Sequence, residues 1–287
     1  MEKFPDTKFE SVGYKKEFGF QLVEMKDLFS FKPDTKKNPF QPHRINFFAI
    51  LLLTEGEMTH EVDFVEYKMT EGDCLFISKD QIHKFDKSGN YNGYGVIFTE
   101  EFMLHHLSLS AFSKISFFHN NHLNPSLFKD PGNRDLFLVA LKRELSLDLG
   151  KAKADVVASM LTVFLLKTQL NTNRALQFYP NDYLQFMEFR KLVSSKYTET
   201  RTAKDYTSFL NITHKQLNKL CKEFTKKTTK EYINNYIVLE AKRKLAATNL
   251  PIKHIAYECG FSEMTNFLKF FKQITGITPK QFREIRT

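Results

Sequence analysis

The sequence predicts an α+β protein of more than one domain. A small N-terminal β-barrel or jelly roll with flanking helices is expected, followed by an all-α domain that contains two helix-turn-helix units. Short apolar runs separated by turn residues fill the first third of the chain, amphipathic helical periodicity follows, and one helical pattern near the C-terminus occurs twice. A chain of 287 residues with 42% hydrophobic residues can build one or two ordinary cores.

The first hundred residues are expected to form strands. Glycine-containing turns are expected at residues 55–57 and 71–73, between runs rich in β-branched and aromatic residues. Several short strands at roughly ten-residue spacing are typical of a small barrel or jelly roll. The expected strands are residues 46–53, 58–64, 74–77 and 91–98.

Two amphipathic helices are expected next, over residues 135–147 and 154–170. The first has Leu136 and Val139 on its apolar stripe. These stripes must be buried, either against the barrel or in a homodimer interface. Residues 172–182 lack periodicity and contain a proline, which is typical of a linker. The expected domains are a barrel at 1–122, a helical dimerisation or packing segment at 123–171, a linker at 172–182 and a double helix-turn-helix domain at 183–287.

An internal repeat organises the C-terminal part. A helix-turn-helix outline by itself is as compatible with ordinary packing as with DNA binding, but here the apolar stripe recurs after fifty residues. The stripe positions are Phe267, Phe270, Phe271 and Ile274 in the second copy, and Leu217, Leu220, Cys221 and Phe224 in the first. Two copies of one helical unit are therefore expected.

The helix ends repeat as well. Thr278 with Gln281 and Thr228 with Glu231 both have the spacing of a capping box. Thr213 is expected to cap the first recognition helix, and either Ser262 or Glu263 the second. The turns between the paired helices are expected at Asn211 and Gly260, two residue types that tolerate a left-handed backbone.

Charge is unevenly divided along the chain. Residues 183–287 hold 20 of the 42 Lys and Arg residues but only 9 of the 33 Asp and Glu residues, a net charge of +11, which leaves −2 for the rest. A basic surface is often only a solvated face, but this asymmetry is typical of a domain that binds a polyanion. The cluster at residues 242–244 is expected to be either a phosphate contact or an exposed basic turn.

The C-terminal part resembles the DNA-binding domain of the AraC/XylS family of transcription regulators, over about residues 183–286. The chain departs from the family pattern at Ile237 and Leu268. The resemblance rests on Thr248, Ile252, Ile255, Ala256, Gly260, Phe261, Phe267, Phe271, Lys272, Gly276, Pro279 and Arg283. The N-terminal part is similar to the cupin-like sensor domain of such regulators. The resemblance implies double-stranded DNA, a small-molecule effector and a second copy of the chain as partners, with RNA polymerase as a further candidate.

The N-terminal part of a recognition helix faces the base edges, which selects the expected reading residues. Asn218 is expected to contact adenine and Lys272 a phosphate, while Leu268 and Met264 make the second copy less polar. We therefore expect the first copy to contribute more base discrimination and the second more positioning. The expected DNA contacts are Lys215, Asn218, Lys219 and Lys222 in the first copy, and Met264, Thr265, Lys269 and Lys272 in the second.

A metal-dependent cupin enzyme with a fused helical module is the alternative function. Such enzymes bind metal through closely spaced histidines and a carboxylate, whereas His43 has no histidine two residues away. Neither a metal, a cofactor nor a catalytic residue is therefore expected. His43 and His83 are expected either to contact a small effector or to lie at the surface near the barrel mouth, and His60 is the third histidine of this region.

The remaining signals concern cysteines and membranes. Cys74, Cys221 and Cys259 are scattered within apolar patterns and are expected to be small buried hydrophobes. The longest apolar run, residues 47–53, is far shorter than the roughly 20 residues that cross a bilayer. The first residues lack the apolar core of a signal peptide, so a cytoplasmic protein is expected.

Overall fold

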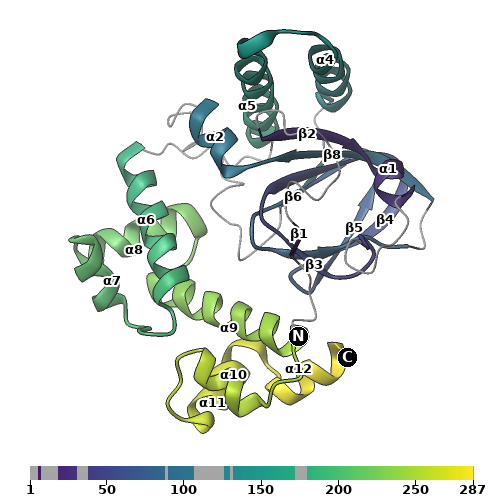
Figure 1. Ribbon diagram of the computed structural model, residues 1–287. Coiled ribbons are helices and arrows are strands. Elements are labelled where there is room, and N and C mark those ends of the chain that lie inside the picture. Colours follow the sequence, from purple (N-terminus) through teal and green to yellow (C-terminus); the bar gives the residue numbers. More distant parts are fainter. Residues whose placement is uncertain are drawn as a thin grey trace. The chain divides into compact units, whose positions relative to one another are not determined.

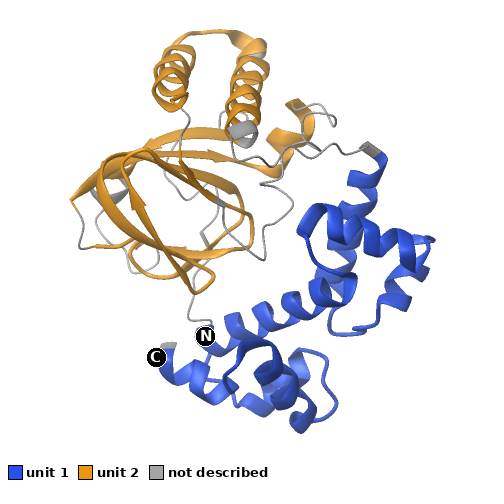
Figure 2. Ribbon diagram, turned by 180° about the vertical axis from the view of Figure 1, so that it is seen from behind, with its two compact units in different colours: residues 1–3, 179–287 blue, residues 4–178 orange. Residues whose placement is uncertain are grey.

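The structure is a computed structural model of the chain. It describes residues 6–7, 19–30, 38–87, 90–106, 126–129, 132–171 and 180–286. Two compact units are distinguished, one over residues 4–178 and the other over residues 1–3 and 179–287 (Figure 2). We call them the strand unit and the helical unit. The predicted α+β architecture, with strands first and helices last, is confirmed.

The strand unit is a sheet that curls around an apolar core (Figure 1). Strand β4 is its centre, because it pairs antiparallel with β5, β6, β7 and β8. Strand β1 pairs parallel with β3. The elements are β1 Asp6–Thr7, β2 Phe20–Glu24, α1 Met25–Ser30, β3 His43–Ile45, β4 Phe48–Val62, β5 Val65–Thr70, β6 Asp73–Ile77, β7 Ile82–Lys84, β8 Tyr91–Phe98, α2 Glu100–His106 and β9 Ser126–Lys129.

The predicted turn at residues 55–57 is wrong, because this stretch lies inside the single strand β4. The register with β8 shifts between Leu53 and Glu55, which marks a β-bulge that bends the strand. Gly56 has φ +77°, and a Cβ atom there would lie 2.1 Å from the carbonyl oxygen of Asn90. The glycine therefore allows two backbones to approach closely. The chain instead reverses at Asp63 and Phe64, which adopt left-handed φ values before β5.

Alternation along the strands divides their side chains between two apolar layers. Leu51, Leu53 and Leu75 belong to the core inside the curled sheet. Phe48 lies on the opposite face, with ring centroids 5.6 Å from Phe98. Both layers are buried, so the first six residues of β4, Phe48 to Leu53, form a continuous apolar run rather than an alternating one.

Two helices flank the sheet beside β2 and β8 (Figure 1): α4 Arg134–Ser146 and, after the short turn η3 Gly150–Ala152, α5 Lys153–Asn171. Both predicted helices are confirmed, but the predicted apolar stripe of α4 does not pack against the sheet, which leaves the homodimer alternative. Leu136 and Val139 are 74% and 69% exposed, whereas Phe137 and Leu141 are buried. Arg134 fixes how α4 is rotated about its axis. Its guanidinium donates to the Leu53 carbonyl at 2.6 Å and so holds the face with Phe137 and Leu141 toward the sheet.

The helical unit contains α6 Pro180–Lys196, α7 Ala203–Leu210, α8 His214–Thr225, α9 Thr229–Ala247, α10 Ile252–Glu258, α11 Met264–Thr275 and α12 Pro279–Arg286. Helix α6 begins at Pro180, inside the predicted linker, because proline is favoured at the first helical position. Residues 172–179 of that linker lie outside the described residues. Within the described part of the chain, no helix is both long and apolar enough to cross a membrane.

Candidate nucleic-acid interface

Two helix-turn-helix units lie within the helical unit, α7–α8 and α10–α11, with α9 running between them (Figure 1). The predicted turns are confirmed: Asn211 has φ 52° and Gly260 has φ +78°. The predicted capping boxes are confirmed as well. At α9, Thr228 and Glu231 cap each other reciprocally, and at α12 the backbone N–H groups of Thr278 and Gln281 bond to each other's side chains at 2.9 and 3.2 Å.

Aromatic packing orients each recognition helix. Behind α8, the rings of Phe186 and Phe224 stack with centroids 4.7 Å apart. Behind α11, Phe267 meets Phe261 at 5.3 Å between centroids. The predicted apolar stripe is buried in full on α8, whereas on α11 the side chains of Phe270 and Ile274 are only half-buried. Each packed face leaves the opposite side of its recognition helix open to solvent.

The open face of α8 is basic. Lys215, Lys219 and Lys222 are all exposed, as expected for side chains that would meet DNA. The Lys219 ammonium lies 3.8 Å from an Asp182 carboxylate oxygen and 3.6 Å from one of Glu223. Exposed pairs at these distances contribute little free energy, so they leave Lys219 able to turn toward a phosphate.

Asn218 differs from its three lysine neighbours. Its side chain is half-buried, and its Oδ1 accepts a hydrogen bond from the backbone N–H of Thr229 at 3.1 Å. Thr229 is the first residue of α9, so the amide satisfies one of the N–H groups that every helix leaves unpaired at its start. This bond engages Oδ1, one of the two side-chain atoms that a bidentate contact with adenine would use.

The open face of α11 carries less charge. Thr265, Lys269 and Lys272 are exposed, while Met264 is half-buried. Asn266, which is not among the expected DNA contacts, is also exposed in the first turn of this helix. Its position directly after Thr265, in the part of the recognition helix that faces base edges, is the signal that could have identified it.

The basic cluster at residues 242–244 is neither an exposed turn nor an open phosphate site. Arg243 is 1% exposed and its guanidinium lies 2.6 Å from a Glu240 carboxylate oxygen. The Lys244 ammonium pairs with Glu258 at 2.7 Å, which ties α9 to α10. Two of the three cations are therefore paired with carboxylates inside the protein.

His43, His60 and His83 of the strand unit are all buried, so the surface alternative expected for His43 and His83 is wrong. They occupy alternate inward positions of β3, β4 and β7, and His60 Nε2 lies 3.0 Å from His83 Nδ1. The rings of His43 and His83 are 4.4 Å apart. Among the described residues, no group of three or more His, Cys, Asp or Glu side chains is arranged to hold a metal ion.

Burial keeps these imidazoles neutral. It lowers the pKa of His60 from its usual 6.5 to about 3, and the pKa values of His43 and His83 are lowered for the same reason. His43 Nδ1 lies 2.9 Å from the Gln41 carbonyl oxygen. His60 Nδ1 and His83 Nε2 are buried without a hydrogen-bond partner, so each could bond to a polar group that enters the core. The cysteines Cys74, Cys221 and Cys259 are buried, as predicted.

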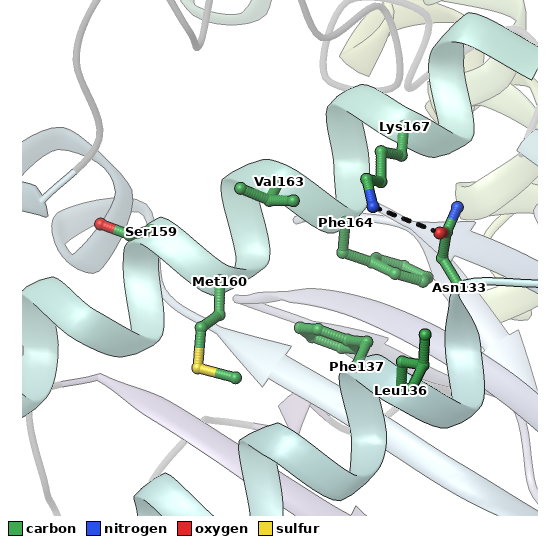
Figure 3. Close-up of a pocket in the computed structure, with 8 residues that line it drawn as sticks. All are labelled: Asn133, Leu136, Phe137, Ser159, Met160, Val163, Phe164 and Lys167. Atoms are coloured by element: carbon green, nitrogen blue, oxygen red, sulfur yellow. Dashed lines mark hydrogen bonds between the residues drawn. The ribbon is translucent and has the colours of Figure 1, made fainter.

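An open apolar groove of about 350 Å³ lies between α4 and α5 (Figure 3). The stacked rings of Phe137 and Phe164, 4.4 Å apart, join its two walls. A hydrogen bond of 3.5 Å from Lys167 to Asn133 closes one end. The groove is lined by Asn133, Leu136, Phe137, Ser159, Met160, Val163, Phe164 and Lys167.

Comparison with known proteins matches both units. A family model described as a helix-turn-helix domain matches residues 206–285, and one described as an AraC-like ligand binding domain matches residues 33–146. The HTH-type transcriptional activator RhaS of Escherichia fergusonii is 20% identical over 287 residues, which cover 98% of each chain. The uncharacterized HTH-type transcriptional regulator YisR of Bacillus subtilis is 33% identical over 98 residues, 34% of each chain. The structure of ToxT from Vibrio cholerae is 15% identical and covers 94% of this chain and 99% of its own, with a TM-score of 0.46.

Proposed function

We propose that this chain, which belongs to the AraC family of transcription regulators, reads two successive major-groove segments of one DNA duplex under the control of an effector in its strand unit. One observation carries the proposal: two helix-turn-helix units lie in one compact unit, and each presents exposed lysines on its recognition helix. Successive major-groove segments on one face of a duplex are about 10 bp apart. The relatives are transcription regulators, which favours this function over a metal-dependent cupin enzyme.

Selection of bound fragments from a random duplex pool, with the purified full chain, tests the DNA-reading function. Affinity for the selected site is then measured against salt concentration. We expect log K to fall with log salt by about 0.9 for each phosphate that a lysine or arginine neutralises. A chain that binds no duplex at about 50 mM salt, or whose affinity does not change with salt, would contradict the proposal.

The effector is proposed to bind inside the curled sheet, against the neutral histidines. His60 Nδ1 and His83 Nε2 offer hydrogen bonds within an otherwise apolar core, and the His43 ring lies 4.4 Å from that of His83. A ligand that binds the folded chain raises its melting temperature. We expect a metabolite library to contain compounds that raise it, and a His83→Phe variant to lose that response. A chelator should leave the melting temperature unchanged, and unfolding on chelation would instead favour a metal site.

Homodimerisation is proposed to use the exposed apolar face of α4 and α5. Leu136, Val139 and Val163 are all more than half exposed and lie on or beside the groove of Figure 3. Sedimentation tests the interface. The wild-type chain is expected to be a dimer and the Val139→Lys variant a monomer. Val65→Lys is the control: Val65 is also exposed but lies on β5, outside the proposed interface, so this variant should remain a dimer. A monomeric wild type would contradict the interface.

RNA polymerase remains a candidate partner, to be tested by transcription in vitro.

A further inference from the structure

A contact away from α9 joins the two helix-turn-helix units. The segment between α6 and α7 lies against the turn between α10 and α11, through Thr198 and Arg201 on one side and Gly260 and Phe261 on the other. We infer that these four residues, which we call the clasp, hold the two recognition helices in one relative orientation and thereby set the spacing of the two DNA segments that the chain reads. This inference rests on the proposed DNA-reading function.

The first half of the clasp is a backbone contact. A Cβ atom at Gly260 would lie 2.2 Å from the carbonyl oxygen of Thr198 and 2.7 Å from its carbonyl carbon. A backbone group cannot rotate away as a flexible side chain can, so only glycine lets the two segments approach this closely. At the corresponding turn of the first unit, Asn211 carries an exposed side chain. The glycine thus serves the contact between units as well as the left-handed turn.

The second half is a cation–π contact. The guanidinium carbon of Arg201 lies 4.0 Å from the centre of the Phe261 ring. Phe261 is 2% exposed, and its ring lies 5.3 and 5.1 Å from those of Phe267 and Phe270 on α11. Arg201 therefore connects the first unit to the aromatic core that orients the second recognition helix.

The clasp restricts movement between the two helix-turn-helix units. If α9 were their only connection, the second helix-turn-helix unit could bend or twist relative to the first. The Tyr236 hydroxyl donates to Ser194 Oγ at 3.0 Å, and the ring of Tyr197 lies 5.5 Å from that of Tyr236, so the end of α6 is already fixed to α9. Because the clasp continues from this end to the turn at Gly260, the two units are attached along two separate lines.

Rigidity of this kind has a measurable consequence on DNA. One inserted base pair rotates the second segment by about 35°, since one turn takes about 10–10.5 bp. A rigid pair of recognition helices cannot follow that rotation, whereas a pair joined by α9 alone could. The clasp residues are therefore positioning residues, and the dependence of affinity on spacing is the property that they control.

The experiment measures the affinity of the full chain for the selected site and for versions with one base pair inserted or removed between the two segments. Gly260→Ala and Arg201→Ala weaken the clasp. Gly276→Ala is the matched control for backbone strain, because Gly276 has φ +80° but nothing within 4 Å of its Cβ position. Lys204→Ala is the control for lost charge, since Lys204 is exposed on α7.

We expect the wild type and both controls to lose at least about tenfold in affinity when the spacing changes by one base pair. The clasp variants are expected to bind the original site more weakly and to differ by less than about threefold among the three spacings. If Gly260→Ala does not fold, the test depends on Arg201→Ala alone, which is expected to fold because the Arg201 side chain is exposed.

Two results would overturn the clasp while leaving the DNA-reading function intact. One is a wild-type chain that binds all three spacings equally. The other is an Arg201→Ala variant with the spacing profile of the wild type and an unchanged melting temperature. A wild-type chain that binds no duplex at all would instead refute the DNA-reading function, and the clasp proposal with it.

Discussion

The two helix-turn-helix units have the same apolar stripe but are stabilised differently. In the first, the Thr213 hydroxyl accepts from the Gln216 N–H at 3.1 Å and caps α8, whereas in the second Glu263, the residue before α11, makes no side-chain capping bond. The first turn is open at Asn211, while the second is packed at Gly260 against a neighbouring segment. The first unit thus relies on local hydrogen bonds and the second on contacts with residues distant in sequence.

The largest expected difference between the turns is in stability. Gly260→Ala adds a steric conflict with the Thr198 backbone to the strain of a left-handed alanine, so we expect it to lower the free energy of unfolding by about 3 kcal/mol or more. Gly276→Ala adds only the strain, about 1 kcal/mol. Urea denaturation followed by circular dichroism measures both, and equal effects would show that the Thr198 contact is not tight.

The recognition helices are expected to differ in what they read. Lys215→Ala, at the start of α8, should cost about 1–3 kcal/mol on the selected site and relax its preference at one end. Lys272→Ala, at the end of α11, should weaken binding equally for all sequences and reduce the salt slope by about one contact. Titration of both variants against selected and scrambled duplexes distinguishes a loss of base preference from a uniform loss of affinity. Unchanged affinity and preference in the Lys215 variant would remove it from the reading face.

Acid is expected to destabilise the strand unit through its buried histidines. Burial lowers the pKa of His60 below its unfolded value of 6.5, so below pH 6.5 the unfolded chain takes up a proton that the folded chain excludes. Stability contributed by the neutral imidazole is therefore lost as the pH falls from about 6.5 toward about 3, by up to about 1.4 kcal/mol per pH unit. Melting curves from pH 7.5 to 5 test this, and His60→Gln should flatten the profile. A wild-type profile that is already flat would contradict the burial.

The smallest expected effect concerns Asn218. Because its amide caps α9, Asn218→Ala should lower the free energy of unfolding by about 1 kcal/mol and weaken binding to selected and scrambled duplexes alike. Asn218→Asp keeps an acceptor for the Thr229 N–H and should retain the stability. The opposite result, unchanged stability with a lost preference at one base pair, would restore Asn218 as a base contact.

The helix ends and turns of the helical unit could be predicted because they depend on neighbours within a few residues. The capping boxes at Thr228 and Thr278 require only a partner three positions later, and Asn211 and Gly260 suit a left-handed turn by their own chemistry. The repeat itself is visible because one buried stripe repeats at fixed spacing. These features carried the prediction of two DNA-reading units without any knowledge of how they pack.

Tertiary structure decided the features whose partners are far away in the chain. The Gly56 bulge depends on Asn90, the rotation of α4 on the Leu53 carbonyl that Arg134 reaches, and the clasp on segments about sixty residues apart. By its helical position alone Asn218 is expected to be a surface amide, but in the folded chain it accepts the Thr229 N–H at the start of α9. Local sequence sets a residue's helical or extended state, but its side chain's partner depends on which distant backbone packs against it, because burial and hydrogen bonding are settled only when the chain folds.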